Sequence, residues 1–250
     1  MRYKILFSNI GYARGIDGSL SHHIRGIGRN LYCPVPVQQQ VIGQIKNLMS
    51  EERPDLCCFV EVEAGRQYNH IEALSDDIYA YSDISGKYGE TSFYSRLPFH
   101  ARKGNGLIAS HPLVYDRLYL RHGVKKLVYR VALENGVTAL FAHLSLLPRT
   151  RALQIAELRA MIETMEGEVL LMADFNILNG AEELSPLLQG GGLHLLNQEG
   201  THTFSFHRRK LMLDLALCTA ALKERVEMRV IPQPYSDHAA LLVDILPDRF

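Results

Sequence analysis

The sequence predicts an α/β fold for this chain of 250 residues. Short apolar runs end abruptly in polar residues, as in Val169-Leu170-Leu171-Met172-Ala173, which Asp174 and Asn176 follow. Apolar runs bounded by turn residues are typical of strands buried on both faces. Segments with apolar residues three or four positions apart lie between several runs, which indicates helices that pack on a sheet.

Six of these runs carry a polar side chain at one end. The runs and their polar residues are 3–7 before Asn9, 56–60 before Glu61, 138–142 before His143, 169–173 before Asp174, 213–215 with Asp214, and 239–246 after Asp237 and His238. One such residue has an ordinary explanation as a solvent-facing cap. In α/β folds, however, ligands bind where strand ends gather, so the repetition indicates a common site.

Two helices follow from apolar spacing. The first has Val37, Val41, Ile45 and Leu48 on one face and ends at Arg53-Pro54-Asp55. The second spans 151–166, with Leu158, Met161, Ile162 and Met165 on one face. Positions i, i+3, i+4 and i+7 share a helix face, so we expect both helices to pack on sheets.

An Asn135-Gly136 pair separates the strand-like runs 127–134 and 138–143. This dipeptide predicts a β-hairpin with a type I′ turn, because it tolerates positive φ at both central positions. Neighbouring antiparallel strands exclude a purely parallel sheet.

Composition sets broader limits. With 47% hydrophobic residues the chain can bury a substantial core, and we expect one domain over residues 1–250. The 27 basic and 27 acidic residues cancel, which argues mildly against binding bulk nucleic acid. The cysteines, at 33, 57, 58 and 218, form no CxxC motif and fit a reducing compartment. Cys57 and Cys58 should face opposite sides of a strand. No apolar run of membrane-spanning length occurs, so a cytoplasmic protein is expected.

The segment 11–36 is rich in Gly, His and Arg and has no clean period. A solvated loop is one interpretation; a rim that selects the substrate, with Arg25 and Arg29 as contacts, is the other. The basic run 207–210 could likewise contact a phosphate or lie in solvent. Adjacent His22 and His23 are most simply solvated.

Taken in order, a set of motifs resembles the endonuclease/exonuclease/phosphatase superfamily from Asn9 to His238. The motifs are Ser8-Asn9-Ile10, Val60-Glu61, Gly104-Asn105-Gly106, His143-Leu144-Ser145, Ala173-Asp174-Phe175-Asn176, Leu213-Asp214 and Ser236-Asp237-His238. The superfamily includes DNase I-like nucleases, abasic-site endonucleases, neutral sphingomyelinases and inositol-polyphosphate phosphatases. The resemblance implies a four-layer αββα sandwich: two mixed β-sheets face to face, helices outside, and the site at one edge.

The resemblance also implies a metal site. Asn9, Glu61 and Asp237 would hold Mg²⁺, with Mn²⁺ as a substitute. A site with few protein ligands and several open coordination positions suits Mg²⁺, because this ion keeps several of its water ligands. The histidines lack the spacing of zinc sites.

The remaining roles are implied in the same way. Asp174 would orient or deprotonate the attacking water, and Asn176 would bond the phosphate as charge develops. His238 would donate to the phosphate, kept protonated by Asp214. His143 would be a second phosphate contact. Outside this group, Arg149 could touch a phosphate or simply begin a solvated helix.

We therefore expect Mg²⁺-dependent hydrolysis of a phosphate ester, most simply a small-molecule or lipid head-group phosphodiester. A nuclease is the first alternative, favoured by the basic run 207–210. Abasic-site endonucleases carry a tyrosine where this chain has His143, which argues against that branch. A non-catalytic module that binds phosphate ligands is the alternative from another class. The sequence leaves the oligomeric state open.

Overall fold

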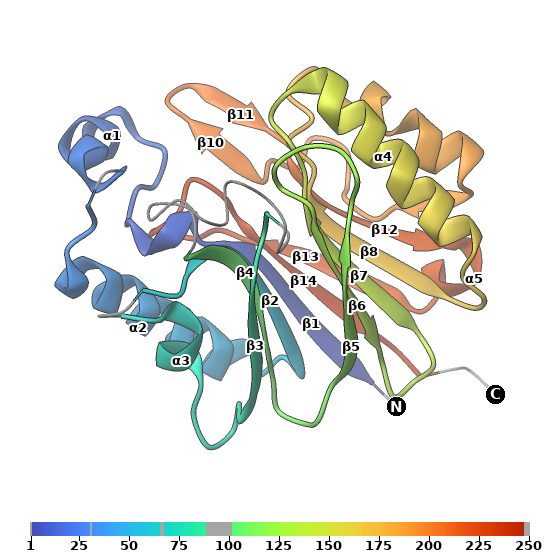
Figure 1. Cartoon of the computed structure of the whole chain (residues 1–250), viewed down its shortest axis with the longest axis horizontal. Coiled ribbons are helices and arrows are strands. Elements are labelled where there is room, and N and C mark those ends of the chain that lie inside the picture. The colour runs from blue at the N-terminus through green and yellow to red at the C-terminus, as the bar shows by residue number, and fades with distance from the viewer. Residues whose placement is uncertain (1, 31, 66–67, 89–101, 248–250) are drawn as a thin grey trace.

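The structure, a computed structural model, describes residues 2–30, 32–65, 68–88 and 102–247. Two six-stranded β-sheets face each other, and helices cover their outer faces (Figure 1). Both sheets are mixed, with one parallel pair of strands in each. The predicted four-layer sandwich is therefore confirmed.

The first sheet pairs the beginning of the chain with its end. Its strands, in spatial order, are β13 (Val226–Ile231), β14 (Ala240–Ile245), β1 (Tyr3–Asn9), β2 (Leu56–Glu63), β4 (Lys103–Ala109) and β3 (Tyr81–Gly86). Only β1 and β2 run parallel. The helices α2 (Val35–Glu52) and α3 (His70–Leu74) pack on its outer face.

The second sheet comes from the middle of the chain. Its order is β5 (Val114–Tyr119), β6 (Leu127–Ala132), β7 (Thr138–His143), β8 (Val169–Asp174), β12 (Asp214–Thr219) and β9 (Leu193–Leu195). Its outer face is covered by α4 (Pro148–Glu163) and by the short turns η4 (Ala181–Leu184) and η5 (Pro186–Gly190). A further short helix, α5 (Ala220–Lys223), follows β12.

Smaller elements lie at one end of the sandwich. They are η1 (Gly11–Ala13), α1 (Leu20–Gly26), η2 (Ile27–Asn30) and a hairpin of β10 (Phe204–Phe206) and β11 (Arg209–Leu211). In Figure 1 the hairpin and α1 lie at the upper end, whereas both termini lie at the lower end. Segment 11–36, predicted to lack a period, thus contains short helical turns.

The main core lies between the sheets. Alternate residues of each strand point inward, and the Phe7 and Phe141 rings stack across the gap at 6.4 Å. Cys58 belongs to this core, whereas Cys57 faces the layer of α2 and α3. The prediction that these neighbours face opposite sides is therefore confirmed.

The two predicted long helices are present with shifted ends. Arg53 ends α2 in the left-handed conformation, with φ of 49°. The second helix, α4, begins at Pro148, because proline suits the first helical turn, where no backbone donor is needed. No helix among the described residues is both long and apolar enough to cross a membrane.

The predicted hairpin joins β6 to β7, but its turn is not of type I′. Only Gly136 has a positive φ, of 82°. The N–H of Gly136 donates to Leu133 O at 3.0 Å, and the N–H of Leu133 donates to Val137 O at 2.9 Å. A tight turn followed by one left-handed glycine is the usual form of a longer hairpin loop. Asn135 instead accepts the Val137 N–H through its side chain.

Candidate active site

Three of the predicted catalytic residues lie side by side at the edge of the second sheet. His143 ends β7 and pairs in register with Asp174, at the end of the parallel strand β8. Asp214 begins β12 and pairs with Asp174 from the other side, because β12 is antiparallel. Their strand neighbours two residues away belong to the inter-sheet core. The same alternation therefore directs all three side chains toward the opposite sheet.

Asn9 meets this row from the first sheet. Ile5 and Phe7 face the inter-sheet core, so the side chain of Asn9, two residues further, points the same way. Its Nδ2 donates to Asp174 Oδ2 at 2.9 Å, and its Oδ1 accepts the Gly11 N–H at 3.0 Å. This buried bond ties the two sheets together where their apolar core ends.

Glu61 reaches the same space through a break in strand alternation. The β2–β4 register shifts between Val60 and Val62, and Glu61 has a left-handed φ of 55°. Val60 faces the inter-sheet core, whereas Val62 faces the α2 and α3 layer, so the bulge reverses the alternation. The Glu61 Oε1 thereby lies 3.9 Å from His143 Nε2 of the second sheet.

His238 is fixed from two sides. Its Nδ1 lies 2.7 Å from Asp214 Oδ2, which is fully buried. Its backbone N–H donates to Ser236 Oγ, which in turn donates to Asn9 O at 2.8 Å. The segment before β14 is thus attached to the end of β1, and the imidazole packs on the Phe204 ring at 4.8 Å.

The charge on His238 follows from its neighbours. Burial alone would lower the pKa of His238, but the carboxylates of Asp214 and Asp174 outweigh burial and raise it. The imidazole is therefore protonated near neutral pH, and both of its nitrogens are donors. Its Nε2 lies 3.5 Å from Asn9 Nδ2, which places two donors beside one another. Such a pair suits an anionic oxygen.

Asp174 is held by several donors. Besides Asn9, the Asn176 N–H donates to Asp174 Oδ1 at 3.1 Å. Asn176 has a left-handed φ of 54°, and its Nδ2 donates to Leu144 O at 3.0 Å. One N–H of this amide thus holds the amide in place, and no described residue accepts the other. Non-glycine residues in this conformation cluster at functional sites, because their strain must be offset by surrounding contacts.

His143 is a neutral imidazole in this arrangement. Burial first, and then Lys125, lower the pKa of His143 well below its ordinary value. The Lys125 ammonium donates to His143 Nε2, which also lies 3.2 Å from Asp174 Oδ2. No described residue bonds Nδ1. Because Nε2 accepts from Lys125, the single proton of the neutral ring is on the buried Nδ1, and beside Nε2 the donor is the Lys125 ammonium.

The predicted metal ligands fit a hard cation by donor type. Burial raises the pKa of Asp237, and the neighbouring Glu61 raises it further, although His238 opposes this. Burial also acts to raise the pKa of Glu61, but Lys125 and other cations hold it below its usual value. Two carboxylates and the amide oxygen of Asn9 are the ligand types that Mg²⁺ prefers.

A second group with metal-ligand atoms consists of Asp174, Asp214 and His238. In this group His238 Nδ1 and Asp214 Oδ2 are already bonded to each other. A metal at that place would have to displace this buried contact. This contact therefore argues against a metal bound by both Asp214 and His238.

Two of the three predicted substrate-binding arginines, Arg29 and Arg149, do not join this cluster. Arg29 donates to the carbonyls of Arg14 and Gly15, at 2.8 and 3.4 Å, and so holds backbone rather than facing the site. Arg149 is exposed in the first turn of α4. Arg25 lies in α1, but its side chain is outside the described part of the chain.

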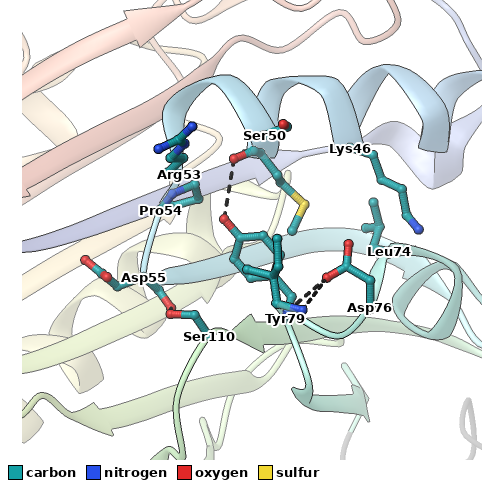
Figure 2. A pocket seen from close by; sticks show the side chains of 11 residues that line it. Lys46, Ser50, Arg53, Pro54, Asp55, Leu74, Asp76, Tyr79 and Ser110 are labelled. Atoms are coloured by element: carbon teal, nitrogen blue, oxygen red, sulfur yellow. Dashed lines mark hydrogen bonds between the residues drawn. The ribbon is translucent and has the colours of Figure 1, made fainter.

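A pocket of about 490 Å³ lies at the opposite end of the first sheet (Figure 2). It is lined by Arg53, Asp55 and Tyr79, among others, where α2 ends and β2 begins. Glu61 lies at the other end of β2. This pocket is therefore separate from the cluster of predicted catalytic residues.

Several residues that hold the site were not predicted from the sequence. Thr203 Oγ1 accepts the backbone N–H groups of Leu213 and Asp214, which fixes the start of β12. Lys125 precedes β6, and Lys87 lies in the turn after β3. A lone lysine in a turn carries no sequence signal that separates a site residue from a solvated one.

Comparison with known proteins confirms the family resemblance seen in the sequence. Residues 38–238 match the model of the endonuclease/exonuclease/phosphatase family. No curated protein sequence gives a significant match. Among solved structures, an endonuclease/exonuclease/phosphatase from Beutenbergia cavernae has a TM-score of 0.68 at 17% identity and covers 98% of this chain and 72% of its own.

Two further solved structures are similar over nearly the whole chain. An AP endonuclease from Archaeoglobus fulgidus has a TM-score of 0.66 at 13% identity and covers 96% of this chain and 98% of its own. TDP2 from Caenorhabditis elegans has a TM-score of 0.65 at 14% identity, with coverages of 98% and 74%. At such identities these likenesses support the fold alone.

Proposed function

Because the chain belongs to the endonuclease/exonuclease/phosphatase family, whose members hydrolyse phosphoesters, we propose that it is a Mg²⁺-dependent phosphodiesterase. The proposed substrates are small-molecule or lipid head-group phosphodiesters. The proposal is carried by one observation: Asn9 and Asp174 bridge the two sheets directly beside the Asp214–His238 pair. The Asp174 carboxylate is a fixed proton acceptor, and His238 Nε2 and Asn9 Nδ2 are two adjacent donors. This combination suits the attack of water on a phosphate.

In this proposal Asn9, Glu61 and Asp237 hold the cation, for which Mn²⁺ can substitute. When bound, the cation supplies charge relief at the phosphate oxygens and assists the leaving oxygen. Asp174 orients the attacking water and accepts its proton. Asn9 Nδ2 and the Asn176 N–H hold the Asp174 carboxylate in place for that task, and general bases act within hydrogen-bond reach of the water.

The donors stabilise charge that develops on the phosphate. The imidazolium of His238 and the free N–H of Asn176 would each bond a non-bridging oxygen, as donors do in an oxyanion hole. Asp214 keeps His238 charged and fixes its ring. His143 contributes on the opposite side, where it holds the ammonium of Lys125. We infer that the phosphate contact expected of His143 is made jointly with this lysine.

Nuclease activity is the second candidate, and one observation favours it. The exposed basic residues 207–210 lie at the β10–β11 turn, next to the site. The Ser205 N–H donates to Asp237 O at 2.8 Å, which attaches this hairpin to a proposed metal ligand. Zero net charge argues against broad electrostatic attraction to nucleic acid.

The test is hydrolysis across a substrate panel with Mg²⁺, with Mn²⁺ and with chelator. The panel contains an activated aryl phosphodiester, sphingomyelin, inositol phosphates, plasmid DNA and an abasic duplex. We compare His238→Ala with His194→Ala, a control on β9 away from the site. The expected result is metal-dependent diester turnover that falls about a hundredfold or more in His238→Ala alone.

Each other outcome has a meaning. Preference for plasmid DNA or the abasic duplex over the small diesters would favour the nuclease. Turnover that is indifferent to chelator or to His238→Ala would refute the mechanism. No turnover of any substrate, together with binding of phosphate ligands, would mean that the chain is a non-catalytic binding module.

A further inference from the structure

Three cationic side chains from separate segments gather around the ring of Tyr12. The distances to the ring centroid are 4.6 Å from Arg14 Cζ, 4.9 Å from Lys103 Nζ and 5.0 Å from Lys87 Nζ. Lys87 also donates to the Tyr12 hydroxyl. Lys87 is only 5% exposed, and lysine is almost never buried without a counter-charge.

The backbone holds this cluster firmly. Gly11, Tyr12 and Ala13 have consecutive left-handed φ values of 52°, 56° and 53°. Two of these residues have side chains, for which this conformation is strained and marks a site where surrounding contacts enforce it. The turn directly follows Asn9, so Tyr12 is fixed relative to the active site.

The cations are also tied to both sheets. The Lys87 N–H donates to Lys103 O at 3.4 Å, and the Lys126 N–H donates to Lys87 O at 2.7 Å. Lys126 is adjacent to Lys125, whose Nζ lies 3.9 Å from Glu61 Oε1. Lys125, Lys103 and Arg14 also lie close enough to Lys87 to act on its charge, so the Tyr12 cluster and the proposed active site share one basic wall.

Positive charge exceeds negative charge along this wall. Four cations belong to it, Arg14, Lys87, Lys103 and Lys125, and the described carboxylates that act on Lys87 and Lys103 are Glu61 and Glu63. In the proposed function Glu61 is a metal ligand, so its charge is already matched. Cation–π contacts with one ring stabilise cations weakly. A rigid, half-buried excess of Arg and Lys suits a phosphate group, to which both bind strongly.

We propose that Arg14, Lys87 and Lys103 bind a second phosphate group of the substrate, next to the phosphate ester that is hydrolysed. The position next to the reacting phosphate rests on the proposed function. The binding of an anion at this wall rests on the geometry alone. The preferred substrate then carries at least two phosphates, either on one small molecule or as neighbouring phosphates of a nucleic acid strand.

The first test measures binding by calorimetry, on the full chain with excess Mg²⁺. The probes are methylenediphosphonate, which cannot be hydrolysed and carries two phosphate-like groups, and methylphosphonate, which carries one. We expect methylenediphosphonate to bind at least about tenfold more tightly, and to lose about tenfold in affinity in Lys103→Gln and in Arg14→Gln. Lys223→Gln, an exposed control on α5, should bind like the natural chain.

Lys103 and Arg14 are chosen because they are partly exposed, so their variants should fold; circular dichroism and thermal unfolding check this. Equal affinity of the natural chain and both folded variants for methylenediphosphonate would overturn the proposal. Binding needs no turnover. If the variants lose affinity for methylenediphosphonate while the natural chain hydrolyses no substrate, the second phosphate site is supported and the proposed function is refuted. If the natural chain hydrolyses a diester but the variants keep their affinity for methylenediphosphonate, the proposed function is supported and the second phosphate site is refuted.

The second test separates the two sources of the second phosphate. Inositol 1,4-bisphosphate and the dinucleotide pTpT are compared as competitors against the aryl phosphodiester. A small-molecule substrate is supported if inositol 1,4-bisphosphate inhibits more strongly than pTpT and if this inhibition weakens about tenfold in Lys103→Gln. The same loss seen only for pTpT supports a nucleic acid strand. Inhibition by both ligands that is unchanged in Lys103→Gln would again overturn the proposal.

Discussion

The Asp214–His238 pair allows a prediction whose size follows from the structure. Asp214→Asn replaces a fully buried carboxylate that lies 2.7 Å from His238 Nδ1. The amide oxygen can still accept from Nδ1, so the ring should keep its orientation and lose mainly its counter-charge. A hydrogen bond to a charged group contributes about 1.5–3 kcal/mol. Since about 1.4 kcal/mol corresponds to one pH unit, the pKa of His238 should fall by about 1–2 pH units.

This loss should appear in the pH dependence of kcat/KM for an aryl phosphodiester. In the natural chain the two carboxylates raise the pKa of His238, so the donor is lost only well above neutral pH. In Asp214→Asn the alkaline limb should move to lower pH, and the rate on that limb should fall about tenfold to a hundredfold. Asp116→Asn, at an exposed ion pair with Arg130, is the matched control and should change neither.

Stability supplies a second readout of the same pair. Because the folded-state pKa of His238 lies above its unfolded value, its contribution to stability is complete below about pH 6.5 and is lost as pH rises through the folded-state pKa. Burial raises the pKa of Asp214 to about 7, so the pair loses its negative partner as pH falls further. Urea unfolding should therefore separate Asp214→Asn from the natural chain most clearly near pH 7, where Asp214 is ionised and His238 is protonated. An alkaline limb that stays in place in a folded Asp214→Asn protein would refute the reasoning.

Three more predictions test the metal site, a buried ion pair and the early segment. Glu61→Gln should raise the Mg²⁺ concentration for half-maximal activity at least about tenfold, as measured by metal titration; an unchanged midpoint would exclude Glu61 as a ligand. Arg151→Ala should destabilise the chain by about 3–5 kcal/mol. The reason is that Arg151 is fully buried, where it donates to Glu183 and to the Ser145 and Leu146 carbonyls. The control Arg159→Ala, at an exposed ion pair in the same helix, should cost about 0.5 kcal/mol or less, so similar urea midpoints for the two variants would contradict this prediction. Gly18→Ala should lower the melting temperature and expose segment 11–36 to limited proteolysis. The reason is that the φ of Gly18 is 79° and a Cβ there would lie 1.9 Å from Ser205 O. The control Gly28→Ala, at a position with open space around it, should behave like the natural chain.

Much of the fold was predictable because its strands are short and strongly apolar. The strands β1, β2, β7, β8 and β14 are central, buried on both faces, and therefore visible as continuous apolar runs. Edge strands were not predicted in this way. In β5 and β13 the side chains are largely exposed or half-buried, so their sequences alternate weakly and resemble surface loops.

The sequence by itself determined which polar residues end the buried strands, because a carboxylate or an amide after an apolar run is a local pattern. Only the tertiary structure decided how they meet. The β7–β8–β12 register aligns His143, Asp174 and Asp214, and sheet packing brings Asn9 to Asp174. The bulge that turns Glu61 inward, and Lys125 beside His143, likewise depend on contacts between residues far apart in the chain. Register and sheet packing are fixed by the sum of many apolar contacts, which no single motif encodes.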